Sequence, residues 1–119
     1  MNSIKNNEIL KTSITQDGIF RLVLSNPDNQ NVLSEEMMSN MQLALDESII
    51  TKRIRVIIIS AEGPIFSAGH DLKELTRKRQ DSDKGKSYYQ KIMKKCSKLM
   101  QSIVNNPKPV IAEINGVAT

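Results

Sequence analysis

Two apolar runs with strand-like alternation lie near the start of the chain and flank a tight turn. In EILKTSITQDGIFRLVLS the runs are separated around Asp17-Gly18, a dipeptide that strongly favours a β-hairpin. In the second run Phe20, Leu22 and Leu24 share one face. The following NPDNQN, residues 26–31, consists of turn formers without periodicity and predicts a loop.

Helical spacing appears in two long segments. Ser34 can cap the free amides of a first helix, and apolar or small residues then repeat on one face: Met37, Met41, Ala44, Leu45 and Ser48. The second helix ends at Asn105-Asn106-Pro107. Its lysines lie on one face, and its other face is apolar and carries Ile92, Cys96, Leu99 and Ile103. RKRQDSDKGK, residues 77–86, precedes it and predicts an exposed connection.

Two further segments predict strands. IRVIIIS, residues 54–60, lacks alternation and is rich in β-branched residues, which is typical of a strand buried on both faces. PVIAEINGVAT, residues 109–119, places Val110, Ala112 and Ile114 on one face. Because strands and helices alternate, the chain predicts an α/β fold with a parallel sheet. The chain stops just past a strand, so we expect it to be a fragment.

The turn FSAGHDLKE, residues 66–74, carries the main candidate chemistry. Asp71 and Glu74 have the spacing of a capping box, which predicts a helix start at Asp71. The amides around His70 would then lie at the positive end of the helix, where anions or polarised carbonyls bind. Ala68 and Gly69 have little or no side chain, so a ligand can approach the backbone closely. Tight packing alone also explains such small residues.

Other chemistry for the polar residues of this turn is less well supported. His70 is the sole histidine and has no second histidine or cysteine at ligand spacing, so no metal site is predicted. A nucleophile pair with Cys96 is disfavoured because Cys96 lies on an apolar helix face. Asp71 and Glu74 could form an acid-base pair, but capping accounts for both.

Composition restricts the class of protein. With 119 residues and 39% hydrophobic residues the chain can form one globular domain. The longest apolar run, Val56 to Ile59, is far shorter than the ~20 residues of a membrane-spanning helix, so no membrane partner is expected. The single Cys96 indicates a reducing compartment, and residues 1–10 show no secretory or import signal. We therefore expect a cytoplasmic protein.

The net charge of +4 is concentrated between Lys73 and Lys98, where ten lysines and arginines lie. Such a segment can attract phosphates, and an RNA-binding surface is one interpretation. A solvated helix face is favoured over nucleic-acid binding, because only Tyr88 and Tyr89 lie nearby as aromatic residues.

The two motifs together resemble a known family. IRVIIISAEGPIFSAGHDLKEL, residues 54–75, followed by PVIAEINGVAT, is similar to the crotonase, or enoyl-CoA hydratase/isomerase, superfamily. The histidine after Ala68-Gly69, the LKEL continuation and the GVAT ending resemble one branch of it. The resemblance implies a crotonase-like ββα spiral, with residues 1–119 as the amino-terminal portion of a single domain. It also implies an acyl-CoA thioester as partner, coenzyme A as part of the substrate rather than a separate cofactor, and a homotrimer or hexamer when complete.

The resemblance also implies roles for particular residues. The backbone amide of His70 would be one of two donors to the thioester carbonyl, an oxyanion hole in which one donor contributes about 3 kcal/mol of transition-state stabilisation. The remaining substrate-binding residues would be Asp28, Gln30, Ala68, Gly69, Asp71 and Leu72. Ala68 would offer its carbonyl to the adenine, and Asp28 stands where many members have a basic residue. The second donor and the hydratase glutamates would lie beyond Thr119.

Two functions follow as hypotheses. The leading one is an enzyme of the enoyl-CoA hydratase type, adding water in syn fashion to a 2-enoyl-CoA. The alternative is an acyl-CoA-binding or regulatory homologue without hydratase activity. In either case residues 1–119 alone are expected to be inactive, because one donor and the glutamates are not among them.

Overall fold

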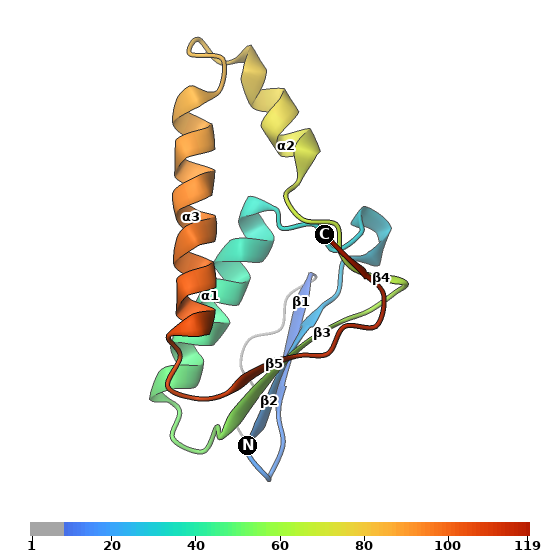
Figure 1. Ribbon diagram of the computed structural model, residues 1–119, viewed down its shortest axis with the longest axis vertical. Helices are drawn as coiled ribbons and strands as arrows, with labels where there is room; N and C mark the ends of the chain where they lie inside the picture. Colours follow the sequence, from blue (N-terminus) through green and yellow to red (C-terminus); the bar gives the residue numbers. More distant parts are fainter. Residues whose placement is uncertain (1–8) are drawn as a thin grey trace.

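A four-stranded sheet in the order β1-β2-β3-β5 forms the base of the molecule, and α1 covers one face of it (Figure 1). The computed structural model describes residues 9–119. The strands β1 and β2 are antiparallel, whereas β3 is parallel to β2 and to β5. In chain order the elements are β1 (Leu10–Ile14), β2 (Ile19–Leu24), the short 3-10 helix η1 (Pro27–Asn29), α1 (Glu35–Ile50), β3 (Val56–Ala61), β4 (Ile65–Ser67), α2 (Leu72–Arg77), the 3-10 helix η2 (Lys78–Gln80), α3 (Lys86–Val104), β5 (Val110–Ala112) and β6 (Val117–Ala118).

Local signals explain the hairpin and the first helix. Gly18 adopts a left-handed φ of 89°, and the amide of Thr15 donates to the carbonyl of Ile19, which closes the β1–β2 turn. Ser34 caps α1, because its Oγ accepts a hydrogen bond of 3.1 Å from the amide of Met37. The hairpin, the α1 start and the α/β class predicted from the sequence are confirmed.

The core lies between the sheet and α1, with α3 packed along α1. Phe20, Leu22 and Leu24 of β2 are buried against the predicted stripe of α1 and against Ile57 and Ile59 of β3. From α3, Ile92 and Leu99 are buried, while Cys96 and Ile103 pack at the edge of the same cluster. The predicted apolar faces of both long helices are therefore confirmed.

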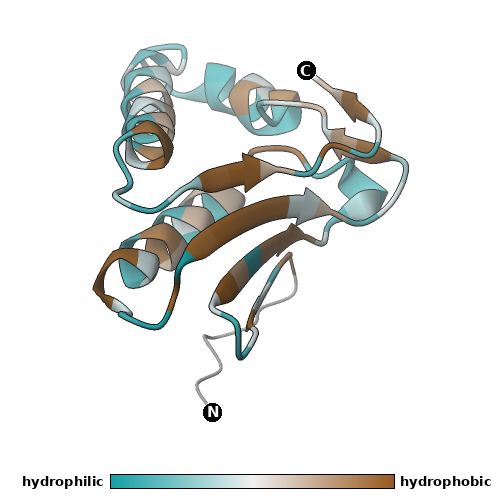
Figure 2. Ribbon diagram, turned by 60° about the horizontal axis from the view of Figure 1, so that its bottom comes forward, coloured by the Kyte–Doolittle hydropathy of each residue, from teal (hydrophilic) through white to brown (hydrophobic). Residues whose placement is uncertain are grey.

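The strand predictions need three corrections. Strand β3 is buried on one face, whereas Val56 and Ile58 are half-exposed, because no element in the described part of the chain covers that side (Figure 2). In β5 the expected inward residue Ala112 is exposed, as is Ile114 beyond the strand. The strand predicted at 109–119 is divided into β5 and the short β6, and β6 pairs in parallel with β4, a strand that was not predicted.

Candidate functional site

The turn between β4 and α2 leaves the backbone amide of His70 open. The amide of Ala68 donates to the carbonyl of Gln30 at 3.0 Å, and the amide of Gly69 donates to the Oγ of Ser67 at 3.1 Å. Within residues 9–119, the amide of His70 donates to no other group and the carbonyl of Ala68 accepts from none. An unbonded donor and an unbonded acceptor thus lie two residues apart in this turn.

Gly69 is required at this turn for two reasons. Its φ of +87° lies in the left-handed region that favours glycine, and a Cβ atom would lie 3.0 Å from the carbonyl oxygen of Thr119. The approach of Thr119 follows from the β4–β6 pairing, in which the amide of Thr119 donates to the carbonyl of Ser67 at 3.0 Å. The sequence segments FSAG and GVAT therefore meet beside the open amide (Figure 1).

Asn31 holds the preceding loop against this turn, and the sequence did not single it out. Its side chain is fully buried. Oδ1 accepts from the amide of Asn26 at 2.7 Å, and Nδ2 donates to the carbonyls of Glu62 and Ile65, both at 2.9 Å. The Oγ of Ser67 donates to the carbonyl of Asn31 at 2.8 Å. An asparagine among turn formers gave no signal of this role.

Asp28 and Gln30 lie in that loop at the molecular surface. Asp28 is in η1 and exposed, and Gln30 is exposed with a left-handed φ of 57°. Gln30 contacts the turn through its carbonyl, which accepts from the amide of Ala68. Main-chain hydrogen bonds thus join the loop predicted at 26–31 to the site turn. The exposed side chain of Asp28 takes no part in them.

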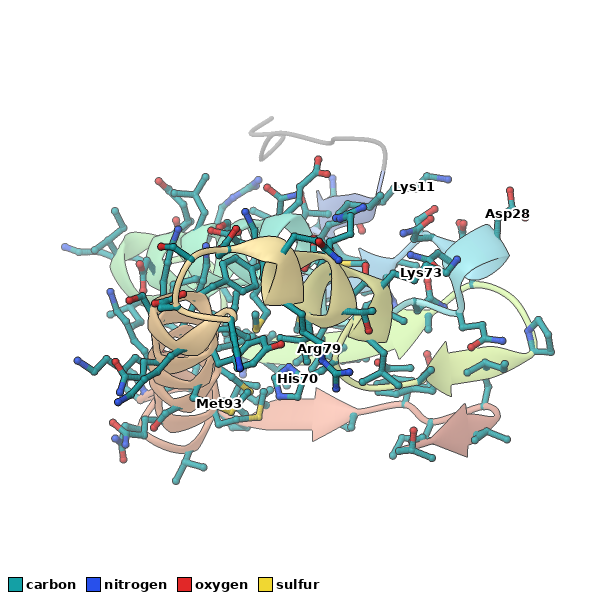
Figure 3. All side chains as sticks on the ribbon, turned by 90° about the horizontal axis from the view of Figure 1, so that it is seen from above. Lys11, Asp28, His70, Lys73, Arg79 and Met93 are labelled. Atoms are coloured by element: carbon teal, nitrogen blue, oxygen red, sulfur yellow. The ribbon has the colours of Figure 1, made fainter. Side chains whose placement is uncertain are left out.

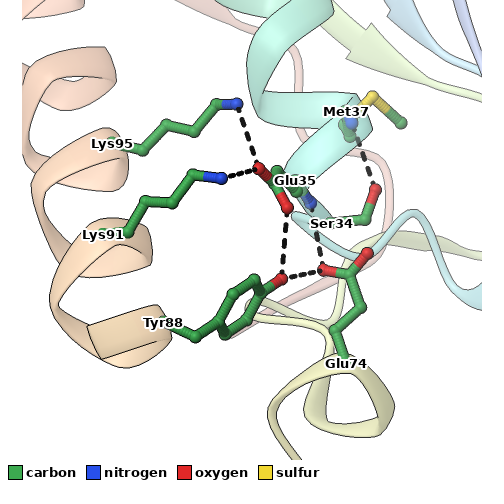
Figure 4. A network of polar contacts seen from close by, with 7 residues as sticks. All are labelled: Ser34, Glu35, Met37, Glu74, Tyr88, Lys91 and Lys95. Carbon is green, nitrogen blue, oxygen red and sulfur yellow. Dashed lines mark hydrogen bonds and ion pairs between the residues drawn. The ribbon is translucent and has the colours of Figure 1, made fainter. Parts of the chain in front are cut away.

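Asp71 caps α2 as predicted, whereas Glu74 bonds to the start of α1 instead of to the backbone of its own helix. The Oδ1 of Asp71 accepts from the amides of Lys73 and Glu74, at 3.0 and 3.4 Å. The carboxylate of Glu74 instead accepts from the amide of Glu35, at the start of α1, at 3.1 Å (Figure 4). The glutamate of the predicted capping box therefore joins the start of α2 to the start of α1.

Tyr88 of α3 closes a polar network around that junction. Its hydroxyl lies 3.4 Å from Glu35 Oε1 and 3.5 Å from Glu74 Oε1 (Figure 4). Burial, together with the charges of Glu74 and Glu35, raises the pKa of Tyr88 to about 12. Lys91 forms an ion pair of 2.9 Å with Glu35 and lowers the pKa of that carboxyl through the hydrogen bond. The three helices are tied together by this network.

An apolar cleft of about 430 Å³ lies between α2 and α3. It begins at Leu72, which is 71% exposed and is two residues from the open amide. The remaining lining residues are Leu75, Thr76, Arg79, Tyr89 and Met93. Figure 3 looks down on this part of the molecule, with Arg79 and Met93 labelled. Its volume is in the range of small-molecule pockets.

The other side chains considered for chemistry, those of His70 and Cys96, are partly buried. The Nδ1 atom of His70 is buried and has no hydrogen-bond partner among the described residues, so this atom does not reach solvent. Cys96 packs against the core. Within residues 9–119 no cluster of three or more histidine, cysteine, aspartate or glutamate side chains is arranged to hold a metal ion. None of the helices in this range is long and apolar enough to cross a membrane.

The site turn joins a strand to a helix, and its open amide follows a left-handed glycine and lies beside the β4–β6 strand pair, on a mixed α/β fold. The sequence pattern of the family described as "Enoyl-CoA hydratase/isomerase" matches residues 14–119. The chain therefore belongs to this family, as the resemblance of its two motifs predicted.

Individual relatives point to the same branch that the motifs resemble. The chain is 47% identical over 102 residues to human "Enoyl-CoA hydratase domain-containing protein 3, mitochondrial". The matched region covers 86% of this chain and 32% of that protein. The crystal structure of human enoyl coenzyme A hydratase domain-containing protein 3 superposes with a TM-score of 0.80 at 44% identity, over 91% of this chain and 40% of that one. The crystal structure of an enoyl-CoA hydratase from Mycobacterium smegmatis also superposes with a TM-score of 0.80, at 30% identity, over 91% of this chain and 40% of that one. The chain thus spans about a third of the length of the curated relatives it matches.

The expectation of a cytoplasmic protein is wrong. The human, rat and mouse relatives at 43 to 47% identity are all named as mitochondrial proteins. The expectation rested on one unpaired cysteine and on the composition of residues 1–10. An unpaired cysteine fits any reducing compartment, and so it does not single out the cytoplasm.

Proposed function

We propose that the polypeptide carrying this chain binds acyl-CoA thioesters and adds water in syn fashion to a 2-enoyl-CoA. The observation that carries the proposal is the open amide of His70, because the two preceding amides are engaged by Gln30 and Ser67. A thioester oxygen placed at this amide would receive a hydrogen bond that strengthens as the oxygen becomes enolate-like.

Three further contacts fit the same substrate. The open carbonyl of Ala68 would accept from the adenine of coenzyme A, and the exposed loop with Asp28 and Gln30 would contact the coenzyme. Leu72, at the start of the cleft, would contact the acyl group, with Gly69 and Asp71 supporting the backbone between them. Coenzyme A enters as part of the substrate, and the proposal includes no separate cofactor.

A second candidate function is acyl-CoA binding without hydration. It is favoured by the carboxylates of the described site, which are engaged in structural bonds: Asp71 caps α2, and Glu74 accepts from the amide of Glu35. No residue within 9–119 is assigned as the acid or the base that hydration requires. Assembly as a homotrimer or hexamer, and residues 1–119 as the amino-terminal portion of one domain, stay predictions.

One pair of measurements separates these functions. The natural-length polypeptide is titrated calorimetrically with butyryl-CoA, and the hydration of crotonyl-CoA is followed by the loss of its conjugated-thioester absorbance. Binding with hydration supports the enzyme, and binding without hydration supports the second candidate. If butyryl-CoA produces no heat and crotonyl-CoA neither binds nor reacts, both functions are refuted.

A further inference from the structure

We propose that the cleft between α2 and α3 takes an acyl chain that ends in a carboxylate, which Arg79 binds at the far end. This inference rests on the proposed binding of acyl-CoA and adds the class of acyl group. It arises from the juxtaposition of one arginine with five uncharged lining residues. The cleft that they line begins at Leu72, two residues after the open amide of His70.

The lining residues of α2 and η2 form one continuous side of the cleft. Leu72, Leu75, Thr76 and Arg79 are spaced as i, i+3, i+4 and i+7, which places them on one face of a helical segment. Tyr89 and Met93 of α3 are spaced as i and i+4 and line the opposite side. The cleft therefore runs along the helical segment from Leu72 to Arg79.

Arg79 provides the charge of the cleft. The hydroxyl of Tyr89 donates to the carbonyl of Leu75 at 2.9 Å, so its donor is already engaged. Within residues 9–119 no ion pair involves Arg79. The nearby Asp83 accepts from the amides of Gly85 and Ser87 at the start of α3. The guanidinium is thus available, and its planar donors fit a carboxylate.

The neighbouring cations are placed differently. Lys78 lies over the ring of Tyr88, with its Nζ 5.0 Å from the ring centroid. Arg77 belongs to the same helical segment as Arg79 but does not line the cleft. Arg77 is therefore a matched control: it has the same charge and is also exposed, two residues away.

The length of the cleft sets the length of the acyl chain. The seven-residue advance from Leu72 to Arg79, in α-helix and then 3-10 helix, spans about 11 Å along the axis. An extended chain advances about 1.2 Å per bond, judged from the extended peptide backbone, so the span corresponds to about nine bonds. An eight-carbon acyl group has eight bonds from its thioester carbon to a terminal carboxylate oxygen, about 10 Å, and a hydrogen bond of about 2.9 Å to the guanidinium then covers this distance. A four-carbon group does not reach.

The test compares two thioesters that differ in one terminal group. The natural-length polypeptide is titrated with the coenzyme A thioesters of octanedioic acid and octanoic acid, in wild type, Arg79→Gln and Arg77→Gln. We expect wild type and Arg77→Gln to bind the dicarboxylic thioester about fivefold more tightly, and Arg79→Gln to lose this preference. The four-carbon pair, succinyl-CoA and butyryl-CoA, should show no preference that depends on Arg79.

Each other outcome counts against the inference in a distinct way. Equal affinity of wild type for both eight-carbon thioesters would overturn it while leaving the proposed function intact. An equal loss of both affinities in Arg79→Gln would assign the arginine to a coenzyme phosphate instead. The same Arg79-dependent preference at four carbons would contradict the position of the charge. If no thioester binds, the proposed function fails and the inference fails with it.

Discussion

Replacing His70 with proline removes the open amide of residue 70 and leaves the hydrogen bonds of the turn in place. Proline has no backbone N–H, and the amide of His70 donates to no group within residues 9–119, so no hydrogen bond of the fold is lost. The preceding residue, Gly69, is the residue type least restricted by a following proline. We therefore expect the free energy of unfolding of His70→Pro to lie within about 1 kcal/mol of that of His70→Ala, which also lacks the partly buried imidazole.

The functional loss should be much larger than the loss of stability. One oxyanion donor contributes about 3 kcal/mol to the transition state, which corresponds to about a hundredfold decrease in kcat for crotonyl-CoA hydration. If the polypeptide binds thioesters without hydrating them, loss of one neutral hydrogen bond of about 1 kcal/mol weakens butyryl-CoA binding about fivefold.

The matched control is His70→Ala, which removes the imidazole and keeps the amide. We expect it to retain most of the activity and affinity of wild type, because the role assigned to His70 belongs to the main chain. Circular dichroism and the melting temperature establish that both variants are folded. A folded His70→Pro variant with wild-type rate and affinity would refute the assignment of the amide, and a His70→Ala variant that loses as much as His70→Pro would move the role to the imidazole.

Two further predictions concern the supports of the site. Asn31→Ala removes three buried side-chain hydrogen bonds and should lower the free energy of unfolding by about 3 kcal/mol in chemical denaturation. Asn29→Ala in the same loop should change it by less than about 0.5 kcal/mol, and a cost below about 1 kcal/mol for Asn31→Ala would contradict the role of Asn31. In an absorbance titration the pKa of about 12 of Tyr88 should appear as a tyrosinate step that Tyr88→Phe removes. Because that pKa is raised above the ordinary tyrosine value of 10.0, the stabilisation of the fold by neutral Tyr88 is complete below pH 10 and is lost as the pH rises toward 12. A Tyr88 step near pH 10 would contradict the network.

Elements set by adjacent residues were predictable from the sequence, and elements set by distant residues were not. The Asp17-Gly18 hairpin and the Ser34 cap depend on side chains within a few positions, and both are confirmed. Strand β6 has two residues, and its pairing depends on β4, about fifty positions earlier in the chain. Such a short segment has no periodicity from which a strand could be recognised.

The candidate site shows the same limit. Asp71 was correctly predicted as a cap because the amides that donate to its side chain lie two and three residues away. The partner of Glu74 depends on where α2 lies relative to α1, which spacing alone does not define. Asn31 shares its residue type with Asn26 and Asn29 in the same loop, and only burial among distant carbonyls distinguishes it.

The contact between Gly69 and Thr119 has a consequence for the order of folding. The two residues are separated by fifty positions, so closing this contact carries the entropy cost of a long loop. The β1–β2 hairpin and α1 can form earlier, from contacts between near neighbours. During synthesis the turn that carries the open amide therefore reaches its final surroundings only after residue 119 has left the ribosome. The earlier residues would form a folded scaffold before they could form a binding site.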